Sequence, residues 1–385
     1  MDHTTRVVVV GAGIVGAACA HELAAAGVDT VVLDRADVGS GTTSRGEGNI
    51  LLSDKGPGAE LALAVLSRQR WLDLGAELGT DALELDGKGG LVVAPTEAAM
   101  AALSAFAATQ RAAGIEVEDV GDPRELEPHL ADDLVGARYY PQDMQVQPVL
   151  AAAALLDAAR RRGADYRPHT EVAEGVFDDA GRLTGVRTTD GEVVWADVVV
   201  NAAGTWGGVV GERLGAPIPV LPRRGFILVT EPVPPLVRHK VYSADYVDNV
   251  GSSAEGLATS SVVEWTRGGT LLIGASRERV GFDPTLSPGT VARLARSATR
   301  MLPVLRDLAL MRVYRGFRPY CPDHLPVVGP DPRCPQVVHA CGHEGAGIGL
   351  ATGTALLVRD HVTGAAGLTE RFAELLPDRL VGVAG

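Results

Sequence analysis

The chain shows short apolar runs that alternate with segments of helical composition. Residues 6–10 and 30–33 are β-branched runs of the kind found in buried parallel strands, and residues 17–26 between them have the small and apolar composition of a helix. The same order returns near the C-terminus, where a strand pattern at 336–341 precedes a helix pattern that reaches about His361. Strands that alternate with helices predict an α/β fold with a parallel sheet.

A glycine motif joins the first predicted strand to the first predicted helix. Gly11, Gly13 and Gly16 have the spacing G-x-G-x-x-G. In this motif the first glycine permits a tight turn, the second lets the backbone approach a pyrophosphate, and the third lets helix and strand pack closely. Asp34 ends the second strand at about the expected spacing and is placed to accept hydrogen bonds from a ribose diol. Together these features predict dinucleotide binding.

The segment after Asp34 bears on which dinucleotide is bound. Residues 39–49 are dense in Gly, Ser and Thr. Such a loop can present backbone and hydroxyl donors to phosphates and to a flavin ring, although a flexible surface loop is the alternative interpretation. Arg35 suggests the extra phosphate of NADP, but an acid at position 34 disfavours that phosphate.

Two further segments carry related patterns. Residues 185–196 predict a hairpin that leads into an apolar strand at 197–201 and a turn of small residues. Residues 167–172, before this hairpin, are placed to pass the adenine. Near the C-terminus the glycine-rich loop 342–353 opens a helix, and a helix N-terminus there would stabilise negative charge on a flavin.

Four segments together resemble the D-amino-acid oxidase superfamily of FAD-dependent amine and amino-acid oxidoreductases: residues 11–16, 201–206, 316–319 and 342–353. Within that superfamily, residues 46–49, 54–58 and 342–345 are similar to the flavin subunits of D-proline and D-hydroxyproline dehydrogenases and of hydrogen cyanide synthase. Glycine and sarcosine oxidases are slightly more distant relatives.

The resemblance implies two domains. One is an FAD-binding, Rossmann-like α/β domain of the glutathione-reductase type, and the other is a β-rich α+β cap that binds the substrate. We expect the FAD-binding domain to be discontinuous, with residues 1–85, 145–220 and 315–385, and the cap domain to comprise residues 86–144 and 221–314.

The resemblance also implies the reaction, which is oxidation of an amino-acid C–N bond. A hydride would pass from the α-carbon to flavin N5 and leave an imine, and the substrate would be a D-amino acid, a D-proline-like imino acid, glycine or sarcosine. Two alternatives stay open. One is oxidation of a 2-hydroxy acid or a polyol phosphate, and the other is a flavin subunit that is active only within a heteromeric complex.

Site residues follow from the same resemblance. In the family an arginine of a Gly-x-Arg-Pro motif anchors the substrate carboxylate, and Arg318 matches it, with Arg315 and Arg312 as local competitors. Around the substrate we also expect Tyr242, Tyr246, His343 and Glu47, for which a core or loop-structuring role is the alternative. Cofactor binding is expected of the following residues: Gly11, Gly13, Ile14, Val15, Gly16, Asp34, Arg35, Thr42, Thr43, Ser44, Arg45, Gly48, Asn49, Val172, Ala203, Gly204, Trp206, Gly345, Ala346, Gly347, Ile348 and Gly349.

Two departures from relatives refine the expectation. Monomeric sarcosine oxidases hold their flavin through a cysteine, but Gly316 stands at the aligned position and Cys321 is out of register, so FAD is expected to be non-covalent. Those oxidases also use a lysine to activate oxygen, and residues 261–270 contain none. This favours a dehydrogenase, for which partner subunits with iron–sulfur clusters are plausible; a homo-oligomer is the other option.

Composition excludes several classes of protein. The 385 residues carry a formal net charge of −13, which argues against nucleic-acid binding. No apolar run is long enough for a membrane span, and no targeting segment is expected. The four cysteines lack the spacing of metal ligands, so no metal site is expected, and free thiols fit a cytoplasmic location.

Overall fold

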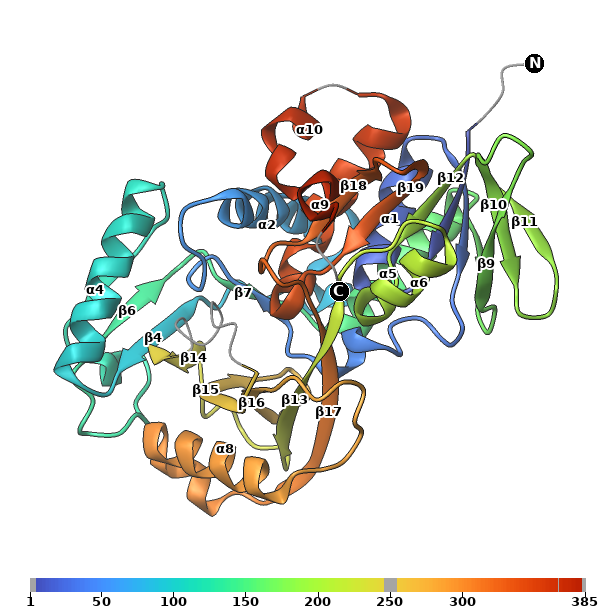
Figure 1. Cartoon of the computed structure of the whole chain (residues 1–385). Helices are drawn as coiled ribbons and strands as arrows, with labels where there is room; N and C mark the ends of the chain where they lie inside the picture. The colour runs from blue at the N-terminus through green and yellow to red at the C-terminus, as the bar shows by residue number, and fades with distance from the viewer. Residues whose placement is uncertain (1–4, 246–254, 366, 383–385) are drawn as a thin grey trace.

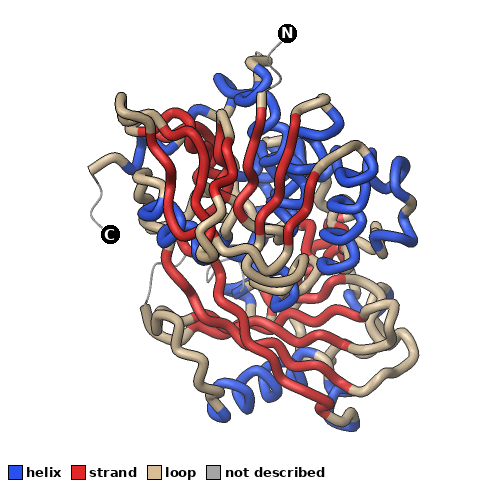
Figure 2. The backbone as a smooth tube through the Cα atoms, turned by 90° about the vertical axis from the view of Figure 1, so that its right-hand side faces the viewer, coloured by secondary structure: helices blue, strands red, loops and turns tan. Residues whose placement is uncertain are grey.

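The computed structural model describes residues 5–245, 255–365 and 367–382 (Figure 1). Two large sheets organise the chain, and Figure 2 shows their strands as an upper and a lower group. The chain passes between the two groups more than once, so segments far apart in sequence meet where the groups adjoin. None of the described helices combines the length and apolar character that a membrane span requires.

The first sheet has six strands, and its central strands are parallel. Its valine-rich first strand is buried on both faces, because Val7 and Val9 pack against helices while Val8 and Val10 pack against a small three-stranded sheet. In order, the strands are β18 (Val327–Asp331), β19 (Cys334–Cys341), β12 (Val198–Asn201), β1 (Arg6–Val10), β2 (Asp29–Leu33) and β8 (Asp165–Arg167).

Helices cover one face of this sheet and strands cover the other. The helical layer contains α1 (Ile14–Ala25), α5 (Pro148–Arg161) and α9 (Gly347–Thr363), with α2 (Ala59–Leu78) packed on α9. The opposite layer contains β9 (Val172–Phe177), β10 (Leu183–Thr188), β11 (Val193–Trp195) and α6 (Gly207–Arg213).

The second sheet has eight strands and is mostly antiparallel. Helix α8 (Pro288–Met301) covers one face of this sheet (Figure 1). Its Leu294 belongs to the same buried apolar cluster as Phe226 and Leu228. The strands, in order, are β17 (Leu310–Tyr320), β13 (Leu221–Thr230), β16 (Leu271–Arg277), β15 (Ala258–Trp265), β14 (Lys240–Ser243), β4 (Gly90–Ala94), β6 (Gly136–Tyr140) and β5 (Glu118–Val120). The smaller elements are α3 (Thr80–Leu83), α4 (Glu97–Ala112), α10 (Leu368–Arg371), and the pair β3 (Asn49–Ile50) and β7 (Met144–Gln145).

The α/β fold class predicted from the sequence is confirmed, and the strand at residues 6–10 has the predicted bounds. Two elements differ. β2 begins at Asp29 rather than at residue 30, and β17 forms a long strand where the sequence indicated only a motif. The expected domain boundary at 315 falls inside β17, and the division into two domains stays a prediction.

Gly16 fixes the packing of α1 against the turn that precedes it. A Cβ at this position would overlap the carbonyl oxygen of Gly11, a backbone atom that cannot move aside. We therefore expect Gly16→Ala to lower the free energy of unfolding by about 1–3 kcal/mol, the usual cost of overpacking. Chemical denaturation of this variant beside Gly121→Ala tests this, because Gly121 has no neighbouring atom within 4 Å. Equal stability of the two variants would contradict the expectation.

Candidate functional site

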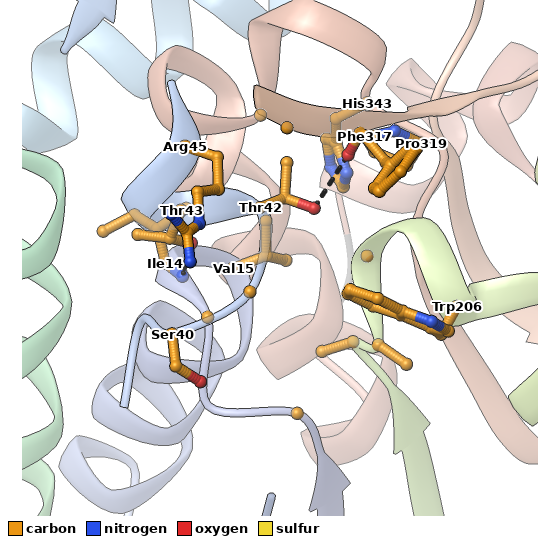
Figure 3. A pocket seen from close by; sticks show the side chains of 18 of the residues that line it. Ile14, Val15, Ser40, Thr42, Thr43, Arg45, Trp206, Phe317, Pro319 and His343 are labelled. Carbon is orange, nitrogen blue, oxygen red and sulfur yellow. Dashed lines mark hydrogen bonds between the residues drawn. The ribbon is translucent and has the colours of Figure 1, made fainter. Parts of the chain in front are cut away.

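One cavity is lined by residues from each of the four segments 11–16, 201–206, 316–319 and 342–353. Gly11, Gly13 and Asp34 line it together with Glu47 and Arg318, which come from the junction of the two large sheets. Figure 3 shows how side chains of the loop 40–45, of Trp206 and of the segment 317–319 surround this space, with His343 beside them. Thr42 ties two of these segments together, because its hydroxyl donates to the carbonyl of Phe317 at 3.0 Å.

The glycine turn forms a cradle that side chains would fill. Gly11 has φ +111°, which favours glycine, and a Cβ there would lie 2.5 Å from the Ala202 carbonyl oxygen. A Cβ on Gly13 would meet only the Thr43 hydroxyl, at 3.2 Å. The first turn of α1 carries no acidic residue, so nothing there opposes an anion. The cradle therefore fits the pyrophosphate of FAD.

Asp34 is held in place at this cavity by backbone donors. Its two carboxylate oxygens accept from the N–H groups of Ala12 at 2.7 Å and Ala36 at 2.8 Å. Burial raises the pKa of Asp34 despite these hydrogen bonds. Arg35 turns toward an aromatic side chain instead, with its guanidinium 4.1 Å from the ring centroid of Trp206.

Most residues predicted to bind the cofactor line this cavity, but five do not: Gly16, Ser44, Gly48, Ala346 and Gly349. Three of these five, Gly16 among them, are glycines that allow close packing. A Cβ on Gly48 would overlap the Val146 carbonyl oxygen, and one on Gly349 would lie 3.2 Å from the Asn49 carbonyl oxygen. The cavity is lined by these predicted residues: Gly11, Gly13, Ile14, Val15, Asp34, Arg35, Thr42, Thr43, Arg45, Asn49, Val172, Ala203, Gly204, Trp206, Gly345, Gly347 and Ile348.

Arg318 reaches the cavity from strand β17. Its Nη1 donates to the Ser276 carbonyl at 2.8 Å, which orients the guanidinium. Gly225 leaves room for it, because a Cβ at this position would overlap Nη1. Arg315 stands three residues earlier, so strand alternation places it on the opposite face, where it is exposed and does not line the cavity.

Glu47 also lines the cavity and belongs to a buried polar cluster. Its Oε2 accepts from the Asn49 amide at 3.3 Å, while Oε1 is buried without a hydrogen-bond partner among the described residues. Behind it, the Lys240 ammonium bonds to both Asn49 and Glu264. Burial is the main cause that raises the pKa of Glu47, and the Glu264 carboxylate adds to it.

The position of Lys240 weakens the argument that the missing lysine in residues 261–270 favours a dehydrogenase. Residues 261–270 contain no lysine, but the adjacent strand β14 brings Lys240 against Glu264 of β15. Lys240 stands on the neighbouring strand, so only the pairing of β14 with β15 reveals its position. The absence of a lysine from 261–270 therefore does not decide between an oxidase and a dehydrogenase.

The other three side chains predicted around the substrate, those of His343, Tyr242 and Tyr246, differ in where they lie. His343 lines the cavity, bonds to Thr354 at 2.9 Å, and has its pKa lowered by burial to about 4. Tyr242 is fully buried, bonds to Ser53 and does not line the cavity, which favours the core alternative for this residue. Tyr246 lies outside the described residues.

Glu344 and Arg223 are two further candidates for a functional role, and their signals in the sequence were weak. Glu344 lines the cavity and pairs with the fully buried Arg223 and, at 3.1 Å, with His324. Arg223 is the cross-strand neighbour of Arg318, a relation that only the β13–β17 register reveals. The signal available in the sequence was a pair of arginines at the start of an apolar strand.

The cysteines lie away from the cavity. All four are buried free thiols, and no cysteine in the described part of the chain lines this cavity. Cys321 packs in a small core with Val220 and Val327. Non-covalent binding of FAD stays a prediction.

Comparisons with known proteins agree with this geometry. Glycine oxidase of Geobacillus kaustophilus is 33% identical over 372 residues, which is 94% of each chain. The hydrogen cyanide synthase subunit HcnC of Pseudomonas aeruginosa is 33% identical over 236 residues, so that 61% of this chain spans only 53% of that relative. The crystal structure of the G. kaustophilus glycine oxidase superposes with a TM-score of 0.85 at 30% identity, covering 99% of this chain and 100% of the other.

A family model described as "FAD dependent oxidoreductase" matches residues 6–361, which include the glycine cradle, the eight-stranded sheet and Arg318. The cradle fits the cofactor that this description names. The chain thus belongs to the DAO family and is an FAD-dependent oxidoreductase.

Proposed function

We propose that this enzyme oxidises the C–N bond of an amino acid by hydride transfer from the α-carbon to flavin N5, which yields an imine. When bound, FAD supplies the hydride acceptor. The observation that carries the proposal is Arg318, a guanidinium that lines the same cavity as the FAD cradle and is oriented by the Ser276 carbonyl. A guanidinium offers two parallel donors to a carboxylate, so it would hold the acid end of the substrate.

The relatives support an amino-acid substrate. Glycine oxidase matches over nearly its whole length, and its name states both substrate and reaction type. Since HcnC is named as a subunit and is matched over about half its length, partner subunits with iron–sulfur clusters remain part of the proposal, with a homo-oligomer as the other arrangement. We also propose a cytoplasmic location, because the four thiols are free.

The roles of the cavity residues follow from this proposal. The predicted residues that line the cavity would hold FAD non-covalently, with Asp34 at the ribose and the Gly11–Gly16 turn at the pyrophosphate. The segments 1–85, 145–220 and 315–385 would form the FAD-binding domain and the segments 86–144 and 221–314 the cap.

Anaerobic mixing of the purified enzyme with a panel of compounds tests the function. We expect loss of the flavin absorbance with at least one of D-proline, other D-amino acids, sarcosine and glycine. Reduction by 2-hydroxy acids or polyol phosphates alone would replace the proposal with C–OH oxidation. A flavin that no compound reduces unless partner subunits are added would make the chain a component of a heteromeric complex.

A further inference from the structure

Glu47 has a carboxylate oxygen that the described chain leaves without a donor. The side chain is only 7% exposed, it lines the cavity with Arg318, and its Oε1 has no hydrogen-bond partner among the residues described. A buried carboxylate oxygen in this state carries a desolvation cost. A donor supplied by a bound molecule would offset that cost.

The charged groups around Glu47 show which kind of donor fits. Lys240 of β14 bonds to Glu264 of β15, so these two charges offset each other. Strand β17 contributes the Arg318 guanidinium and the Tyr314 hydroxyl, which donates to the Gly46 carbonyl at 3.1 Å. Glu47 and Arg318 therefore bring one carboxylate and one guanidinium to the same cavity, which Arg45 and Glu344 also line.

The carboxylate is also held in a fixed position. Asn49 donates to Oε2 of Glu47 and accepts from Lys240, so the lysine fixes the amide that orients the carboxylate. Strand β16 closes in from another side, since a Cβ on Gly274 would lie 2.6 Å from Oε1. A preorganised acceptor of this kind favours a charged donor, because hydrogen bonds between ionised groups are the stronger ones.

We propose that Glu47 binds the substrate ammonium group while Arg318 binds the substrate carboxylate, so that the pair selects zwitterionic α-amino acids over hydroxy acids. This inference rests on the proposed function and adds the substrate class to it. A zwitterion places one charge against each side chain and leaves the site neutral. A hydroxy acid satisfies Arg318 but offers Glu47 only a neutral donor.

Three inert ligands of nearly equal shape test the selection: α-aminoisobutyrate, α-hydroxyisobutyrate and pivalate. None has a hydrogen on the α-carbon, so binding to the FAD-loaded enzyme is read from the flavin spectrum without turnover. We expect the amino ligand to bind the wild type about tenfold to a hundredfold more tightly than the other two. Glu47→Gln, which keeps the shape and the Asn49 contact, should remove this preference.

A pH series gives a second measurement. Burial raises the pKa of Glu47, so its carboxylate takes up a proton at a higher pH than an ordinary glutamate does. Affinity for the amino ligand should fall as the pH is lowered through that pKa, and Glu47→Gln should lack this fall. Glu47→Asp should keep part of the preference, and Glu278→Gln, which removes a carboxylate paired with Arg224 outside the cavity, should keep all of it.

Several outcomes would overturn the inference. The first is that the wild type binds the three ligands with equal affinity, and the second is that it does not bind the amino ligand at all. The third is that Glu47→Gln retains FAD and still prefers the amino ligand as strongly as the wild type does. Failure of the proposed function has a different signature, because the anaerobic panel would then show no reduction by amino acids. Reduction by amino acids with an unchanged Glu47→Gln preference would reject the role of Glu47 alone.

Discussion

Gly13→Val is expected to fold and to be purified without its FAD. A Cβ at position 13 would meet only the Thr43 hydroxyl, at 3.2 Å, so a side chain there requires a small shift of Thr43 but meets no backbone atom. The branched methyl groups would instead extend into the cavity that Gly13 lines, at the N-terminus of α1 where the pyrophosphate approaches the backbone. We expect FAD affinity to fall at least a hundredfold, or about 3 kcal/mol, as measured by the flavin content and by titration of FAD.

The control for this experiment is Gly121→Val, an exposed glycine with no neighbouring atom within 4 Å. It should keep full flavin content, and both variants should show the circular dichroism of the wild type. A substitution at Gly11 would not test FAD binding alone. Its positive φ and the nearby Ala202 carbonyl oxygen mean that a side chain there would disrupt the fold as well. A Gly13→Val protein that retains one FAD per chain would mean that the cofactor is bound in another way.

Local chemistry explains which parts of this structure were predictable from the sequence. The strand, turn and helix at residues 6–25 depend on neighbours in the chain, so the valine run and the three glycines were sufficient to place them. Strand β17 was missed for the opposite reason. It pairs with β13, about ninety residues away, and its own sequence mixes arginines with aromatic and apolar residues rather than showing a clear alternation.

The same distinction applies to the candidate site, where residues in local motifs were predictable and pairs formed between strands were not. Arg318 was identified from its motif, but the choice between it and Arg315 needed the strand register, which places the two on opposite faces. Lys240 and Glu264 were missed as a pair because they lie on different strands, 24 residues apart. Gly48 and Gly349 are predicted to bind the cofactor, which stays a prediction, and in the structure they also allow close backbone packing.

Arg318→Ala is expected to weaken binding of every carboxylate ligand while FAD stays bound. Loss of one partner from a buried charge pair costs about 2–5 kcal/mol, which corresponds to a rise in KM or Kd of roughly thirtyfold to a few thousandfold. Arg318→Lys should recover only part of the affinity, because an ammonium keeps the charge but lacks the planar fork. The measurements are the Kd values for pivalate and α-aminoisobutyrate and the KM for whichever substrate reduces the flavin.

The pattern across variants separates the two charged side chains. Arg318→Ala should lose both ligands, because both carry a carboxylate, whereas Glu47→Gln should lose only the advantage of the amino ligand. Arg315→Ala is the matched control, since it removes an exposed guanidinium from the same strand and leaves the cavity intact. Unchanged constants in Arg318→Ala, together with weaker binding in Arg315→Ala, would mean that the carboxylate is held on the other face of β17, and the proposed substrate site would have to move there.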